Sequence, residues 1–165
     1  DAKATTEVDT AGEVQTLADA VSAIMAYVPT TTTVNVTVAQ LQALGITGVT
    51  PDNLSTVQTA LAQVIAAGNT ATQFNTQAGV QDVVSSAIGG LAAIESAAQN
   101  NNATLISPSV AQYTAIGVTG VDANNLAAIN SALNDADITG TQANTAAKVQ
   151  AIVDGYNAID RKSVG

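Results

Sequence analysis

The chain has 165 residues and a formal net charge of −9, with four basic residues against thirteen acidic ones and neither cysteine nor histidine. Without cysteine it can form no disulfide, thiolate nucleophile or thiolate metal site, and without histidine it lacks the usual general base and the commonest transition-metal ligand. The negative charge opposes nucleic acids and anionic membranes, since both are bound through basic patches.

The core must be built mainly from small aliphatic side chains. Apolar residues make up 47 % of the sequence, but aromatic residues only 2 %. Each small side chain buries little area, at roughly 25 cal/mol per Å², so stability requires helices that approach closely. This composition favours packed helices over a large ligand cavity. No run approaches the ~20 apolar residues that span a bilayer, so membrane insertion is not expected.

The first predicted helix covers residues 10–24 (TAGEVQTLADAVSAI). Thr10 and Glu13 have the spacing of a capping box, in which side chains and backbone donors at a helix start satisfy one another. The expected buried stripe, at helical spacing, comprises Val14, Leu17, Val21 and Ile24. This helix has no partner of its own before residue 29, so we expect it to pack on the repeat that follows.

The run TTTTVNVTV, residues 30–38, alternates apolar and polar residues at its end and has β-propensity. One interpretation is an extended linker between repeats. The alternative is a strand that adds to a neighbouring chain, as in polymerising subunits.

A short helix is predicted next, from the capping-box pair Thr37 and Gln40 to Gly45, where a left-handed C-terminal cap favours a residue without Cβ. A Gly-Ile-Thr-Gly-Val turn follows, and its apolar residues are expected to close the end of a bundle. The second helix is predicted to start at Thr50, followed by proline at the first helical position. Its expected stripe comprises Leu54, Val57 and Leu61.

The chain repeats itself. Residues 38–61 (VAQLQALGITGVTPDNLSTVQTAL) and 110–133 (VAQYTAIGVTGVDANNLAAINSAL) align without gaps and share 12 of 24 residues. The helix predicted for 10–24 corresponds to the third helix of each repeat, because 10–24 aligns with 145–159 (TAAKVQAIVDGYNAI) and more loosely with 76–90. In 145–159 the expected stripe comprises Val149, Ile152, Tyr156 and Ile159. A Val-Gln pair marks each copy, and a period near 70 residues accounts for both blocks.

These elements predict an all-α fold of tandem small three-helix bundles, about 70 residues each, in an elongated array. The expected organisation is a terminal helix of a preceding repeat (1–28), one helical repeat (29–98) and another (99–165). A chain that opens inside a repeat, at Asp1 and without a signal peptide, is interpreted as a piece of a longer array.

Several residues are candidates for sites of chemistry. Asp135 and Asp137 are close in sequence but have no visible acid–base partner, and residues 122–125 (DANN) resemble half a calcium loop but are explained by Asp122 as a helix N-cap. The repeated Gly-x-Thr-Gly lacks the lysine of a phosphate-binding P-loop. The sequence therefore predicts no catalytic, cofactor-binding or metal-ligating residue, and no cofactor.

The strings VAQYTAIGVTGVDANNLAAINSAL, TAAKVQAIVDGYNAI and EVDTAGEVQTLADAVSAI resemble the helical tandem repeats of giant bacterial surface adhesins of the RTX type, which type I secretion exports. The resemblance covers nearly the whole chain and is weakest over 62–79 and 95–106. It implies a spacer that holds a distal binding domain away from the cell, or a cohesion element in a matrix. It carries over no functional residue, because the repeated motif consists of caps and core.

Together these features predict a non-enzymatic, structural or adhesive repeat region of an extracellular bacterial surface protein, with neighbouring repeats as its partners. Two alternatives stay open. The chain is a self-assembling subunit of a surface filament or layer, or it is a three-helix module that binds a host or matrix protein.

Overall fold

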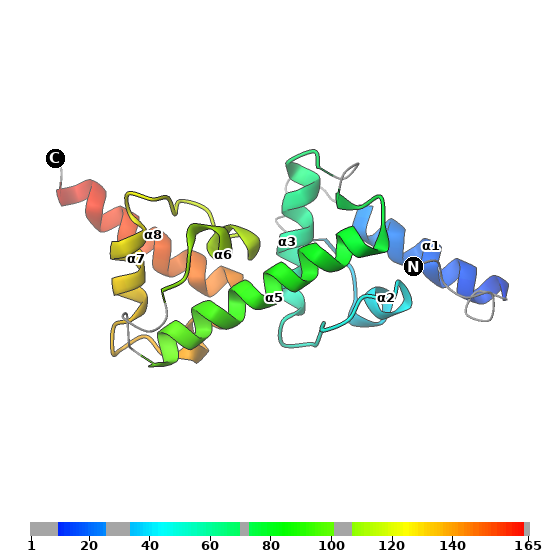
Figure 1. The fold of residues 1–165 in the computed structure, drawn as a ribbon, viewed down its shortest axis with the longest axis horizontal. Helices are drawn as coiled ribbons and strands as arrows, with labels where there is room; N and C mark the ends of the chain where they lie inside the picture. Colours follow the sequence, from blue (N-terminus) through cyan, green and yellow to red (C-terminus); the bar gives the residue numbers. More distant parts are fainter. Residues whose placement is uncertain (1–9, 26–33, 70–72, 101–106, 164–165) are drawn as a thin grey trace. The chain divides into compact units, whose positions relative to one another are not determined.

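A computed structural model describes residues 10–25, 34–69, 73–100 and 107–163. Over these residues the fold is all-α, with seven α-helices, one short 3-10 helix and no β-strand (Figure 1). The helices are α1 (Ala11–Met25), α2 (Val38–Ala43), α3 (Leu54–Ala66), α5 (Gln77–Asn100), α6 (Val110–Ala115), α7 (Leu126–Leu133), η2 (Gly140–Gln142) and α8 (Ala146–Ser163). None of the described helices is long and apolar enough to cross a bilayer.

The chain divides into two compact units, Asp1–Ser85 and Ser86–Gly165. The boundary lies inside α5, so this helix begins in the first unit and ends in the second. The units therefore do not share the bounds expected from sequence similarity, 1–28, 29–98 and 99–165. Helix α1 belongs to the first unit and contacts α2 and α3, which confirms that it packs on the repeat that follows.

Both short helices begin and end as expected. Thr37 with Gln40 and Ser109 with Gln112 form complete capping boxes at α2 and α6. Each helix then ends on a glycine with positive φ, 78° at Gly45 and 94° at Gly117. The following N–H groups bond back into the helix in a Schellman pattern, for example Ile46 N to the Leu41 carbonyl at 2.9 Å and Val118 N to the Tyr113 carbonyl at 3.0 Å.

The second helix of each copy starts later than expected. α3 begins at Leu54 and α7 at Leu126, each four residues after the predicted caps Thr50 and Asp122. The intervening residues form turns, which an asparagine holds in each copy. Asn53 Oδ1 accepts from Thr50 N at 2.9 Å, and Asn125 Oδ1 accepts from Asp122 N at 2.8 Å. Asp122 still caps a turn, since its Oδ1 accepts from the backbone N–H of Asn124 at 2.7 Å.

The third-helix stripes are buried only in part. In α1, Ile24 is buried, but Val14 and Val21 are about half exposed, and in α8 Ile159 is 71 % exposed. The prediction that all four positions face a core is therefore wrong for these three residues. Helix α5 also continues ten residues beyond the repeated block, to Asn100, because its C-terminal half packs into the second unit.

Of the run 30–38, residues 30–33 lie outside the described residues. Residues 34–37 are extended but form no strand. Val34 and Val36 are buried, and Gln58 ties the segment down by donating its Nε2 to the Val36 carbonyl at 2.8 Å. This part of the run therefore packs against its own unit.

The second unit varies this contact with a buried tyrosine. Asn130, the counterpart of Gln58, donates to the Pro108 carbonyl at 2.9 Å and accepts at Oδ1 from the Tyr113 hydroxyl at 2.8 Å. Tyr113 is 1 % exposed, and burial raises the pKa of its phenol well above the ordinary value. The neutral phenol is thus the form that the folded state requires.

We predict that Tyr113→Phe lowers the free energy of unfolding by about 1–2 kcal/mol at pH 7, because it leaves Asn130 Oδ1 buried without this donor. Above pH ~10 the unfolded phenol ionises more easily than the folded one, so stability of the native chain falls as pH rises. Urea unfolding at several pH values should show a shallower fall in the variant. Parallel curves for the two proteins above pH 10 would contradict this assignment.

Candidate functional site

The two aspartates named above as candidates for chemistry, and the nearby Lys148, have structural roles. Asp135 and Asp137 are exposed in the turn after α7, where Asp135 Oδ1 accepts from Asp137 N at 2.9 Å. Lys148 Nζ donates to the Thr141 carbonyl at 2.7 Å and to Asn144 Oδ1 at 2.8 Å. No group of three or more acidic side chains that could hold a metal ion occurs among the described residues.

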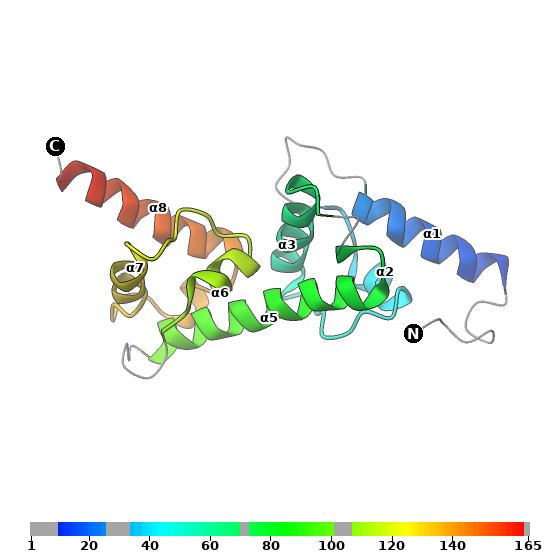
Figure 2. The same ribbon diagram turned by 45° about the horizontal axis from the view of Figure 1, so that its top comes forward.

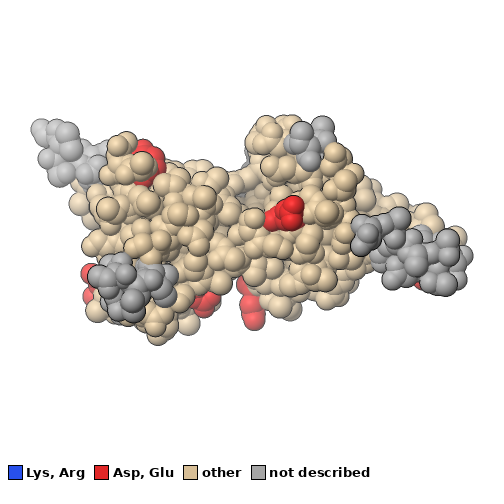
Figure 3. Space-filling view, viewed as in Figure 1, with Lys and Arg blue, Asp and Glu red and all other residues tan. Residues whose placement is uncertain are grey.

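The acidic side chains are scattered. On the face in Figure 3 they lie apart from one another among uncharged residues and form no continuous patch on the part that is not grey. This pattern is typical of charges that keep a protein soluble.

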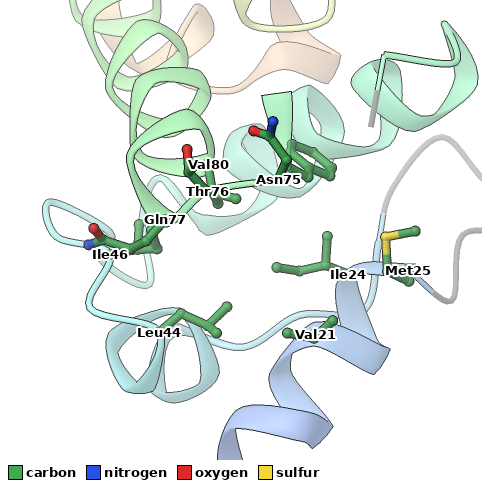
Figure 4. A pocket seen from close by; sticks show the side chains of 10 residues that line it. Val21, Ile24, Met25, Leu44, Ile46, Asn75, Thr76, Gln77 and Val80 are labelled. Carbon is green, nitrogen blue, oxygen red and sulfur yellow. The ribbon is translucent and has the colours of Figure 1, made fainter. Parts of the chain in front are cut away.

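A small apolar hollow lies in the first unit, between α1, the end of α2 and the start of α5 (Figure 4). Its volume is about 200 Å³, and Val21, Ile24, Met25 and Leu44 supply much of its wall. Ligand pockets usually measure roughly 300–1,000 Å³, so the hollow is small for a binding site.

One residue that lines the hollow, Ile24, is replaced by a glycine at the aligned position of the second unit. Gly90 aligns with Ile24, and a Cβ at Gly90 would lie 2.8 Å from the Gln112 carbonyl oxygen. Helix α5 therefore approaches α6 more closely than an isoleucine would allow. In the first unit the aligned Ile24 is buried and lines the hollow.

The most specific duplicated feature is a contact between a glutamine side chain and the Gly-x-Thr-Gly turn. In the first unit, Thr47 N donates to Gln81 Oε1 at 2.8 Å, and Gln81 Nε2 donates to the Thr47 carbonyl at 3.2 Å. In the second, Thr119 N and its carbonyl make the same two bonds with Gln150, at 2.8 and 3.1 Å. We call this pair of bonds the amide–turn contact.

The turn creates the need for this contact. Glycines with positive φ stand on both sides of each threonine, Gly45 (78°) and Gly48 (83°) in the first copy. This geometry takes the threonine N–H and carbonyl out of any helix or sheet, so a side chain or water must take the place of a backbone partner. A primary amide offers one donor and one acceptor side by side and satisfies both groups at once.

Buried apolar residues flank the amide–turn contact, whose own hydrogen bonds are exposed to solvent. Val80 and Val149, each directly before the glutamine, are 8 % and 1 % exposed. The apolar residues of the turns, Ile46 and Val118, are 1 % and 4 % exposed. In the Val-Gln pair that marks the repeats in sequence, the valine therefore packs in the core and the glutamine makes the hydrogen bonds to the turn. Sequence reasoning found the pair but not its partner, which lies more than thirty residues away.

Comparison of the chain with protein-family models, with curated proteins and with solved structures finds no match.

We predict that Gln81→Ala and Gln150→Ala each lower the free energy of unfolding by about 1 kcal/mol, because each leaves a turn N–H and carbonyl with no amide partner. The amides of Thr47 and Thr119 should then exchange faster with solvent. Gln15→Ala is the matched control, since Gln15 holds the same repeat position but contacts Asp19 on its own helix. Equal losses in all three variants would show that the effect comes from helix propensity instead.

Proposed function

We propose that this chain is a structural repeat region of an extracellular bacterial surface protein, acting as a spacer or cohesion element and not as an enzyme. The observation that carries the proposal is the nature of what is duplicated. Caps, glycine turns, core positions and the amide–turn contact recur, and the aspartate that recurs with them, as Asp19 and Asp154, accepts a hydrogen bond from the glutamine of its own helix. Duplication of whole packing units, without a reactive site, is expected of a protein that acts as a mechanical support or a spacer.

The finer architecture belongs to the same proposal. We infer tandem helical bundles of about 70 residues that extend as an array, with the partners being neighbouring repeats of the same chain. Support comes from α5, whose Val84 is buried in the first unit and whose Ile94 is buried in the second. One helix that serves two cores couples each unit to the next along the sequence.

The location and the adhesive role rest on the resemblance to repeats of giant secreted adhesins. The composition agrees with it, because a chain without cysteine is independent of the redox state of its surroundings. The proposal includes no cofactor and no nucleic-acid partner.

Scattering distinguishes the spacer from the self-assembling subunit. A compact globule of this length has a radius of gyration of about 15 Å, so we predict that small-angle X-ray scattering gives a clearly larger value for a monomer. Light scattering should report the monomer mass at all concentrations. A value near 15 Å would contradict the array, and oligomers that grow with concentration would favour a surface filament or layer.

A second measurement addresses the host-binding alternative, which the exposed Val14, Val21 and Met25 of α1 favour. A three-helix module of this kind would retain a serum or matrix protein on an affinity column that carries the chain. We expect that the column retains no protein whose retention is lost in the double variant Val14→Ser with Val21→Ser. A ligand lost in this double variant would assign the function to binding.

A further inference from the structure

Helix α1 carries a face that its relatives in the chain bury. Residues 10–24 align with 76–90 at the start of α5 and with 145–159 at the start of α8. Yet Val14 is 53 % exposed, against 8 % for Val80 and 1 % for Val149. Ala18 is exposed as well, whereas its counterparts Val84 and Val153 are both 0 % exposed. The same repeat positions thus face solvent in one copy and a core in two.

The bare face lies on the N-terminal half of α1. The C-terminal half packs in the first unit, where Ala20 and Ile24 are buried. Figures 1 and 2 show the N-terminal end projecting beyond the other described helices of this unit. Each half of α5 packs into the core of a different unit. Helix α1 resembles α5 in its C-terminal half, which packs into a core, but its N-terminal half packs into none that is described.

The polar member of the face has its side chain in the same local arrangement. Gln15 Nε2 donates to Asp19 Oδ1 at 2.7 Å, as Gln150 Nε2 donates to Asp154 Oδ1 at 2.9 Å. Gln150 also engages Thr119 of the turn through its Oε1 at 2.8 Å. Gln15 keeps the intrahelical bond, and no described turn stands opposite it.

The covering element is the same in both completed copies. Gly-Ile-Thr-Gly (45–48) lies against Gln81, and Gly-Val-Thr-Gly (117–120) lies against Gln150. Val118 of the second turn belongs to the same apolar cluster as Val149 and Val153. In both units, therefore, the start of a helix with this sequence is covered by a Gly-Ile/Val-Thr-Gly turn.

We propose that the N-terminal half of α1 is a docking seat for the Gly-Ile/Val-Thr-Gly turn of a further repeat unit of this type. Gln15 makes the amide–turn contact with the backbone of the threonine in that turn, and Val14 with Ala18 covers its Ile or Val. The seat rests on the repeat architecture of the proposed function, but on neither its location nor its adhesive role.

The chain's own turns are not the occupant. Both already hold a glutamine, Gln81 or Gln150, so a second copy could use its turn only after releasing its own helix. A further repeat unit that uses α1 as its last helix has a turn with no glutamine of its own, so no helix has to be released. The occupant is therefore a unit that precedes α1 in the chain and uses α1 as its last helix, as α6 and α7 precede α8 in the second unit.

A tandem protein tests the seat. Residues 1–144 are followed directly by residues 10–165, so that Thr10 takes the place of Thr145 and α1 of the second copy replaces α8 of the first. The chain contains no cysteine, so a single Val14→Cys substitution reports burial of the seat through its rate of alkylation. We expect this thiol to react at least ten times more slowly in the tandem protein than in the original chain.

The control is Thr16→Cys, because Thr16 and its counterparts Asp82 and Ala151 are all exposed. It should react equally fast in both proteins. Adding Gln15→Ala in the second copy should restore part of the fast reaction of Val14→Cys. It should also speed amide exchange of Thr119 in the first copy.

Two results would overturn the proposal. The first is fast alkylation of Val14→Cys in the tandem protein while Val80→Cys in the same second copy stays protected, since the fold is then intact and the seat empty. The second is protection of Val14→Cys in the original chain that rises with its concentration, which would assign the face to a second copy. Neither result depends on the scattering or retention experiments, so the seat and the proposed function fail separately.

Discussion

The packing of each unit depends on satisfying one exposed piece of backbone. Left-handed glycines before and after a threonine reverse the chain sharply, and they leave that threonine's N–H and carbonyl without a helix or sheet to join. The glutamine amide supplies both missing bonds from a helix more than thirty residues away. The turn thereby fixes where the long helix starts its packing, and the valine before the glutamine is placed over the apolar residue of the turn.

Around this fixed contact the two copies vary in compensated ways. Leu41 and Gln58 of the first unit become Tyr113 and Asn130 in the second, where the shorter amide accepts a bond from the phenol. Both versions still donate to the backbone carbonyl of Val36 or Pro108. Ile24 and Gly90 also differ, since Ile24 lines the hollow of the first unit whereas a Cβ at Gly90 would lie 2.8 Å from the Gln112 carbonyl oxygen. Core shape is thus free to vary where the backbone bonding is kept.

The parts of the fold that sequence could predict are local. The capping boxes at Thr37 and Ser109 and the glycine at position 45 act over three to five residues, so their spacing carries the information. The exposure of Val14 and the length of α5 could not be predicted, because both depend on which unit a helix half meets. The late start of α3 at Leu54 depends on Asn53, whose side chain holds the preceding turn and removes the need for the predicted cap. The partner of Gln81 is equally long-range and has no sequence signal beyond recurrence of the Val-Gln pair.

The chemistry of the amide–turn contact suits a part that repeats. It joins a neutral amide to a neutral peptide group, so salt screens it less than it would screen an ion pair between exposed side chains. An ion pair at the same position would weaken in saline surroundings, and a histidine would switch near neutral pH. Since α5 ends the first unit and begins the second, a weakness of this contact would recur at every junction of the proposed array. A joint built from amide, backbone and aliphatic groups does not depend on an ion pair, a property that would suit the proposed spacer in surroundings of changing salt concentration.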